Sequence, residues 1–313
     1  MQSTVELSAR LRALPAPVLG AFLMIGASAC FAAMNGLIRV VAVELEPVQI
    51  AFLRNLFALL FTLPWLTRIG LHGLRTKRLH LHLWRGVVGL SAMLFWFTSV
   101  ANLPLSEAVA LNFTVPLFAT AAAAIFLGEV VRARRWTATA IGFLGVLIIL
   151  RPGFVELTPM MGLPIAAAAF MAASVTLVKM LSRTESSITI VMFMNLVLTP
   201  LSFLPALFVW RWPSAEIWLA AAGIGFLATL AHIMLTRAYG MADASAIIPF
   251  DYMRLPFVAA IAYFAFGEVA NSWTWIGAAV IAGSSIYIAW REVAAAREGR
   301  ASGAAGESVR ARP

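Results

Sequence analysis

The sequence predicts an all-α integral membrane protein whose ten transmembrane helices form two inverted five-helix repeats. Composition is the first observation: of 313 residues, 62% are hydrophobic and only 12% are charged, and the mean hydropathy is +0.90. Soluble domains carry about 25% charged residues. The second observation is a succession of apolar runs long enough to cross a bilayer. The third is a set of motifs in the first half that recur in the second.

This composition excludes a soluble enzyme, a nucleic-acid-binding protein and a disordered protein, because a soluble chain of this size cannot bury so much apolar surface. The net charge of +9 is therefore interpreted as a topology signal. Cys30 is the only cysteine, so neither an intrachain disulfide nor a thiolate metal cluster can form.

Each predicted span is a run of about 20 mainly apolar residues, and the runs are continuous, which favours helices over β-strands. The ten runs are 17–38, 47–66, 84–102, 107–127, 136–150, 160–180, 188–209, 215–236, 244–266 and 273–290. Residues 1–16 and 291–313 flank them, and the second of these tails is predicted to be disordered because it is rich in Ala, Gly, Arg and Glu. Nine of the ten tryptophans lie near span ends, as in an interfacial aromatic belt, and Trp96 is the exception.

Basic residues cluster on one side of this arrangement. With the N-terminus placed in the cytoplasm, most of the 23 Lys and Arg residues fall in cytoplasmic segments, and Arg39, Arg151 and Arg211 fall outside. Both termini are therefore predicted to be cytoplasmic. The stretch ending at Cys30 loosely resembles a lipoprotein cleavage signal, but its apolar run continues to Leu37, which favours a first transmembrane helix.

Five matches between the halves indicate an internal repeat, each at an offset of 139 to 141 residues. They pair Phe31 with Phe170, Pro64 with Pro205, Pro116 with Pro256, residues 128–130 with residues 267–269 (Gly-Glu-Val in both), and Trp136 with Trp275. A repeat of five spans, here 17–151 and 160–290, must place its second copy upside down. The loop charges agree, because arginines follow Glu129 and no basic residue follows Glu268 at the equivalent place. Inverted repeats are typical of secondary transporters, although a structural or assembly protein with duplicated halves is the alternative.

Further motifs resemble the drug/metabolite transporter superfamily, in its ten-helix form with two EamA domains, over about residues 17–290. The resemblance rests on residues 104–108 (Pro-Leu-Ser-Glu-Ala) leading to Pro116, on Phe-Leu-Gly-Glu at 126–129, on Ala-Ser-Ala at 244–246 leading to Pro256, on Phe-Gly-Glu at 266–268, and on Phe-Leu-Arg at 52–54. It implies a bacterial inner-membrane carrier, often an exporter of amino acids or other metabolites. It also implies a central cavity lined by helices one, three, four, six, eight and nine. Uptake of vitamins or nucleoside-like metabolites, of the riboflavin or S-adenosylmethionine type, fits the same fold.

Ionisable residues inside spans are costly and mark candidate sites. Asp251 and Arg254 lie three apart on one face of the ninth span, where they form either a static ion pair or a group that binds a charged solute or couples protons. Tyr252 between them offers a hydroxyl or a stacking face. Arg54, in the second span, is either a packing residue or a carboxylate-binding one.

The remaining candidates are weaker. His232 could titrate near neutral pH or simply be hydrogen-bonded, whereas Arg237 and Lys179 are interpreted as interfacial. Polar residues within spans that either bridge helices or line a site are Asn35, Asn112, Thr114, Ser174 and Asn195. Phe31 and Trp96 could stack on a planar solute or simply pack. Pro116 and Pro256 can free a backbone carbonyl, and Glu129 and Glu268 at span ends are interpreted as structural or gating groups.

The sequence gives little support for ATP hydrolysis, metal binding or enzymatic catalysis. The sequence has no P-loop GK[ST] pattern and no HExxH motif, so intrinsic ATP hydrolysis and zincin chemistry are not expected. His72, His80 and His82 fall in a basic connection, interpreted as a solvated loop rather than a metal site. No cofactor or nucleic acid is expected, and an intramembrane enzyme is the least favoured reading. The expected partners are a small organic solute, the lipid bilayer and a coupling proton. The sequence predicts no oligomeric state.

Overall fold

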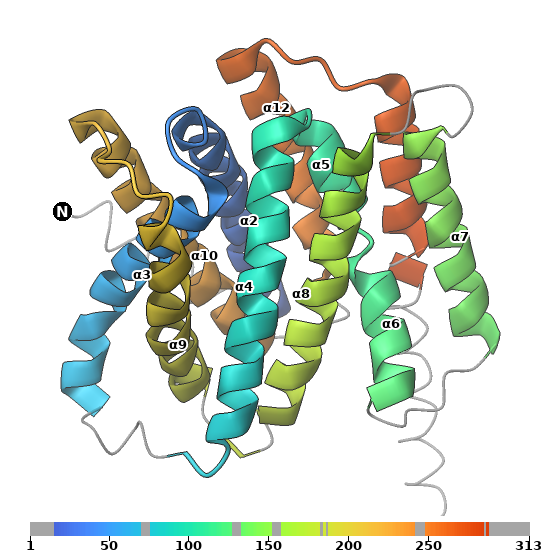
Figure 1. Cartoon of the computed structure of the whole chain (residues 1–313). Helices are drawn as coiled ribbons and strands as arrows, with labels where there is room; N and C mark the ends of the chain where they lie inside the picture. Colours follow the sequence, from blue (N-terminus) through green and yellow to red (C-terminus); the bar gives the residue numbers. More distant parts are fainter. Residues whose placement is uncertain are drawn as a thin grey trace, which may run out of the picture.

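The computed structural model of the chain describes residues 16–69, 76–126, 133–151, 158–181, 184–185, 187–241, 248–284 and 286–287. In these ranges it is an all-helical bundle without strands (Figure 1). The helical segments, in chain order, are α2 Ala16–Val41, α3 Pro47–Ile69, α4 Leu79–Asn102, α5 Leu105–Asn112, α6 Val115–Phe126, α7 Ala133–Leu150, η2 Pro159–Met161, α8 Gly162–Leu181, α9 Ser187–Leu207, α10 Ala215–Met241, η3 Ile248–Met253, α12 Arg254–Phe266 and a last helix over 272–284.

Six of the described helices are long and apolar enough to cross a membrane: α2, α3, α4, α8 together with η2, α9 and α10. Exposed Phe, Leu, Ile, Val and Trp side chains cover much of the bundle surface, for example Phe22, Leu204 and Phe264. A surface so apolar suits lipid rather than water.

The two ends of the bundle are named here after a glutamate at each. The Glu268 end holds the C-terminus of α2, the α9–α10 connection and residues 267–271; the Glu185 end holds the C-terminus of α3 and the α8–α9 connection (Figure 1). Arg39, Arg151 and Arg211 all belong to the Glu268 end. The chain enters α2 and α8 at opposite ends, as corresponding helices of inverted repeats must.

Helix contacts in the two halves mirror each other. Helix α2 packs on α10, α12 and η3, and α8 packs correspondingly on α4, α6 and α5, while α3 packs on α9 between the halves. Each half therefore donates its first helix to the other half. This exchange joins residues that are far apart in the sequence.

One span predicted as continuous is broken, and a second changes from a 3₁₀-helix to an α-helix. The predicted span 107–127 divides into α5 and α6 at the turn Phe113–Thr114, and the predicted span 244–266 consists of η3 followed by α12 in its described part. Each irregularity lies next to a proline, Pro116 two residues into α6 and Pro256 two residues beyond the start of α12. Proline has no N–H for the preceding turn, and its ring clashes with the carbonyl four residues back.

The third span begins earlier than predicted. Helix α4 starts at Leu79 instead of 84, so His80 and His82 belong to a helix and not to a loop. His82 is buried, which corrects its interpretation as a solvated residue, and His72 lies outside the described residues.

Candidate functional site

A chain of polar and aromatic contacts crosses the middle of the bundle between the halves. It begins at Asp251 in η3, whose Oδ1 accepts hydrogen bonds from Ser28 Oγ (3.2 Å) and from Arg254 Nη2 (2.5 Å). Arg254 and Asp251 form an ion pair with side chains 20% and 32% exposed. The Arg254 guanidinium also lies 4.7 Å from the ring centre of Phe31, a cation–π arrangement.

The chain of contacts continues from Phe31 of α2 to α10 and α3. The Phe31 and His232 rings meet edge to face at 5.5 Å, and His232 Nε2 lies 3.3 Å from Arg54 Nη2. Arg54 Nη1 donates to Asn55 Oδ1 (2.8 Å), and Asn55 Nδ2 donates to Ser202 Oγ (3.4 Å). These groups come from α2, α3, α9, α10, η3 and α12, so they bring both halves together. We call Ser28, Phe31, Arg54, His232, Asp251 and Arg254 the midplane cluster.

Further aromatic groups come from the helices around this cluster. Tyr252 meets Phe113, in the α5–α6 turn, edge to face at 4.9 Å. Trp96 Nε1 donates to Asn35 Oδ1 (3.2 Å), and both residues are buried. These aromatic faces lie beside hydrogen-bonding groups, a combination typical of sites for small organic ligands.

Not every predicted candidate joins these contacts. Asn112 and Thr114 are buried at the α5–α6 break, where Asn112 Nδ2 donates to Pro164 O (3.3 Å) and Thr114 Oγ1 donates to Leu111 O (2.8 Å). Ser174 is half-buried in α8, and Pro256 is exposed. Glu129 lies outside the described residues, as do the side chains of Pro116 and Lys179. Arg237 is exposed.

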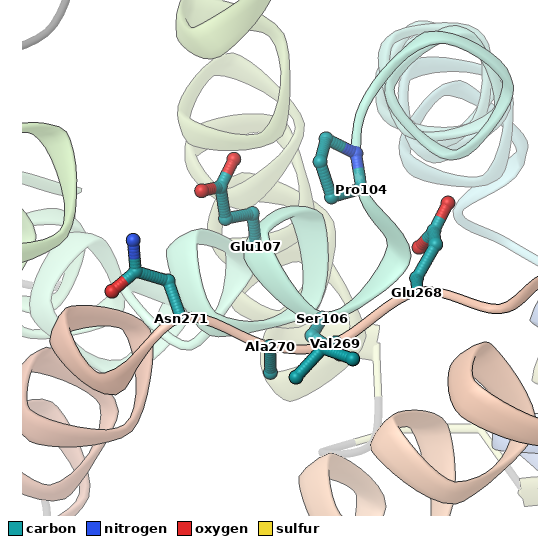
Figure 2. A pocket seen from close by; sticks show the side chains of 7 residues that line it. All are labelled: Pro104, Ser106, Glu107, Glu268, Val269, Ala270 and Asn271. Atoms are coloured by element: carbon teal, nitrogen blue, oxygen red, sulfur yellow. The ribbon is translucent and has the colours of Figure 1, made fainter.

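Glu268 ties the halves together at its end of the bundle. Its Oε1 forms an ion pair with Arg39 of α2, and its Oε2 accepts the backbone N–H of Leu105 (2.9 Å), the first residue of α5. Arg39 also donates to Leu103 O (2.6 Å). A hollow beside it is lined by Pro104, Ser106, Glu107, Glu268, Val269, Ala270 and Asn271 (Figure 2). These contacts suit the structural or gating role predicted for Glu268.

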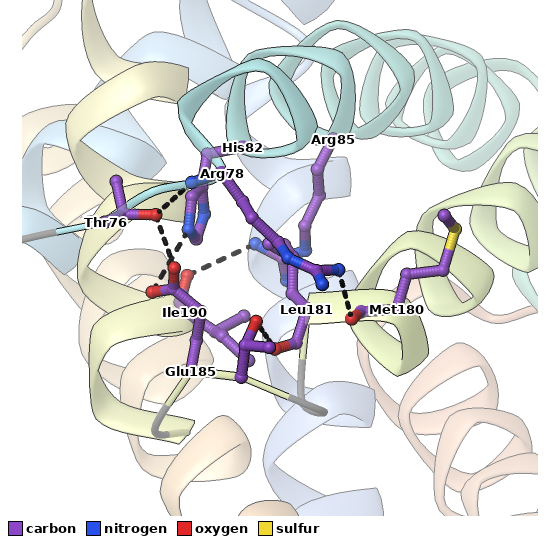
Figure 3. Close-up of polar contacts among 9 residues, drawn as sticks. Thr76, Arg78, His82, Arg85, Met180, Leu181, Glu185 and Ile190 are labelled. Atoms are coloured by element: carbon purple, nitrogen blue, oxygen red, sulfur yellow. Dashed lines mark hydrogen bonds and ion pairs between the residues drawn. The ribbon is translucent and has the colours of Figure 1, made fainter.

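Sequence reasoning missed a second polar cluster at the other end. Figure 3 shows Glu185, between α8 and α9, accepting a hydrogen bond from Thr76 Oγ1 and lying beside His82 of α4. The His82 ring stacks on Phe193 at 4.3 Å. Arg78 Nη1 reaches Met180 O (3.4 Å). No sequence motif marked Glu185, because its partners come from α4 and the segment before it, about 100 residues earlier in the chain.

Comparison with known proteins identifies the family of this chain. Residues 18–151 and 159–290 each match the EamA-like transporter family. The chain belongs to the EamA-like transporter family. It is a membrane transporter and not an enzyme.

Curated relatives of this EamA-like transporter carry different solutes. A riboflavin transporter of Vibrio cholerae is 34% identical over 91% of this chain and 97% of its own length. An S-adenosylmethionine uptake transporter of Rickettsia bellii is 29% identical over 80% and 86%, and a pseudopaline exporter of Pseudomonas aeruginosa is 26% identical over 84% and 93%. One crystal structure, 18% identical, matches 87% of this chain and 98% of its own at a TM-score of 0.61, which supports the shared fold.

Proposed function

We propose that this EamA-like transporter takes up riboflavin, or a closely related planar heteroaromatic metabolite, by alternating access. The observation that carries the proposal is the midplane cluster, where ring faces lie next to hydrogen-bonding groups. Phe31 and His232 offer ring faces, and Ser28, Arg54 and Asp251 offer donors and acceptors. A flavin ring system needs both, because its faces stack on aromatic side chains and its edge exchanges hydrogen bonds.

The curated relatives favour this solute over the amino acids suggested by the sequence. Riboflavin transporters of three bacteria, among them Vibrio cholerae and Rhizobium johnstonii, are each 34% identical to the chain, and the S-adenosylmethionine transporters are 28–29% identical. Both solutes contain a planar heteroaromatic ring. The S-adenosylmethionine relatives are uptake transporters, so uptake is proposed rather than export.

Proton coupling through Asp251 is part of the proposal. Asp251 is the acidic residue of the midplane cluster, and its contacts with Ser28 and Arg254 join α2 to the η3–α12 segment. Protonation of Asp251 would weaken its ion pair with Arg254 and free the two elements to separate. A variant that cannot titrate, Asp251→Asn, is expected to lose stimulation by a pH gradient.

Localisation in the bacterial inner membrane with both termini cytoplasmic is proposed from the basic residues. Arg39, Arg151 and Arg211 share the Glu268 end, which is then the periplasmic face. Fusion of a periplasm-dependent enzyme reporter to the C-terminus should give no activity, and fusion of a cytoplasmic fluorescent reporter should give signal.

The deciding experiment is uptake into proteoliposomes containing the purified full-length chain. Labelled riboflavin should accumulate, unlabelled riboflavin should compete, and alanine or leucine should not. S-adenosylmethionine is a parallel arm that distinguishes the two uptake functions. Vesicles that move neither riboflavin nor S-adenosylmethionine, with or without an ion gradient, would overturn the proposed solute class.

A further inference from the structure

Arg54 carries a buried charge, and its hydrogen-bonding contacts within the described part of the chain are to neutral groups. It lies in the membrane-crossing part of α3 and is 5% exposed. Its hydrogen-bonding partners among the described residues are the side-chain oxygen of Asn55 and the ring nitrogen of His232, at 2.8 and 3.3 Å. Neither is a carboxylate. A buried guanidinium without a counter-charge is costly, so a protein retains one where a ligand supplies the anion.

Arg85 of α4 adds a second charge of the same kind. Its Nη1 donates to Ile190 O (3.5 Å) and its Nη2 lies 3.3 Å from Met194 Sδ, both in α9. Its Nε is buried and has no hydrogen-bond partner in the described part of the chain. The positive charges of Arg54 and Arg85 are close enough to repel each other, and both act on His232.

Among the described residues, the charges from the midplane cluster to Arg85, which lies one turn beyond His82 in α4, do not balance. Arg54, Arg85 and Arg254 contribute three guanidiniums, and Asp251 already pairs with Arg254. The ion pairs of Glu185 and Glu268 tie those carboxylates to His82 and Arg39 at the two ends of the bundle. Within the described residues, the excess positive charge lies between α3, α4, α9 and α10, next to the His232 ring.

We propose that Arg54, with Arg85 and His232 beside it, binds an oxyanion carried by the solute. The substrates then include flavins that bear a phosphate, and riboflavin 5′-phosphate binds at least as well as riboflavin. This proposal rests on the proposed flavin transport and names the part of the substrate that the cluster recognises. Guanidinium groups suit this role because their fork of N–H donors matches two oxygens of one phosphate.

The test measures binding of riboflavin and of riboflavin 5′-phosphate to the full-length protein in lipid nanodiscs, by quenching of flavin fluorescence. Arg54→Gln should weaken the binding of riboflavin 5′-phosphate by about 30-fold or more, as expected when one partner of a buried charge pair is removed. It should weaken the binding of riboflavin far less. Arg54→Lys should recover part of the phosphate affinity. Inorganic phosphate alone should compete with riboflavin 5′-phosphate much more strongly than with riboflavin.

Arg237→Gln, at an exposed arginine of α10, is the matched control and should change neither affinity. The melting temperature without solute separates binding from folding: Arg54→Gln should not lower it, because the variant removes an uncompensated buried charge. The proposal is wrong if both flavins lose affinity equally in Arg54→Gln, or if the variant simply melts earlier and binds the phosphate normally. If wild type binds neither flavin, the proposed function fails first and this proposal fails with it.

Discussion

His82 of α4 and Glu185 of the α8–α9 connection face each other at one end of the bundle, with Nε2 and Oε2 3.5 Å apart and side chains only 1% and 6% exposed. The pair joins the first half of the chain to the second. Glu185 also accepts a hydrogen bond from the Thr76 hydroxyl, so two residues hold the α8–α9 connection in place. In the proposed alternating-access cycle, opening of this end would break these contacts.

Glu185→Gln is expected to lower the stability of the protein by about 1–2 kcal/mol, because buried His82 and Thr76 lose their carboxylate partner. Thermal unfolding in detergent measures the loss. Glu46→Gln is the matched control, since Glu46 is exposed and no side-chain hydrogen bond of its own is found in the described part of the chain. Equal melting temperatures of both variants would contradict a holding role for Glu185.

Asp251 and Arg254 should behave as one unit in a double-mutant cycle. Either Asp251→Asn or Arg254→Gln leaves one partner of a part-buried pair uncompensated, whereas the double variant removes both. We expect a coupling energy of about 1–2 kcal/mol, measured from the unfolding of the four proteins. Strictly additive losses would mean that the pair contributes nothing beyond its single residues.

Gly145 allows α7 and the helix over 272–284 to approach backbone to backbone. A Cβ at Gly145 would lie 2.8 Å from the carbonyl oxygen of Gly277 and 2.7 Å from Ile281 Cγ1. Gly145→Ala should therefore destabilise the protein by about 1–3 kcal/mol, through overpacking between helices.

Gly283→Ala is the control for this change. Gly283 lies in the helix over 272–284, and a Cβ at this position would meet no atom within 4 Å. Its melting temperature should stay unchanged or rise slightly, because alanine favours helix over glycine. Equal melting temperatures of Gly145→Ala and Gly283→Ala would show that the close contact between α7 and the helix over 272–284 is dispensable.

The Arg39–Glu268 contact is expected to open during each transport cycle. Because Cys30 is the only cysteine, a Cys30→Ser background allows Arg39→Cys and Glu268→Cys to be introduced together. A short thiol-specific bridging reagent should then stop uptake, and a reductant should restore it. The single-cysteine proteins, treated in the same way, should remain active. Undiminished uptake in the bridged protein would assign the contact a purely structural role.

Much of the fold could be predicted from local sequence properties. Apolar runs about as long as the bilayer is thick indicated the membrane helices, and the family match agrees with the duplicated motifs. Prolines 116 and 256 pointed to special places in their spans but not to the break or the change of helix type, since membrane helices also tolerate proline without breaking. The start of α4 was misplaced because His80 and His82 read as polar, whereas Glu185 and Phe193 satisfy His82 across the bundle.

The candidate site was harder to predict. One signal was present: Ser28, Phe31 and Asn35 repeat at helical spacing along α2, so they share a face. Ser28 and Asn55 were missed because small polar residues in apolar spans usually bridge helices without further consequence. Nothing local distinguished them from such bridges.

Hydropathy, charge and repeat spacing are properties of the linear sequence, and they indicate the membrane class, the duplicated architecture and a short set of charged residues within spans. The transporter family was indicated by the resemblance of short motifs. Tertiary packing decided which of the residues within spans meet. Ser28 reaches Asp251 across 223 positions, and Arg54 reaches His232 across 178. These contacts depend on how each helix is rotated and which half it packs against. A span that is apolar on every face does not encode that rotation, because lipid and protein interior are equally apolar environments for it.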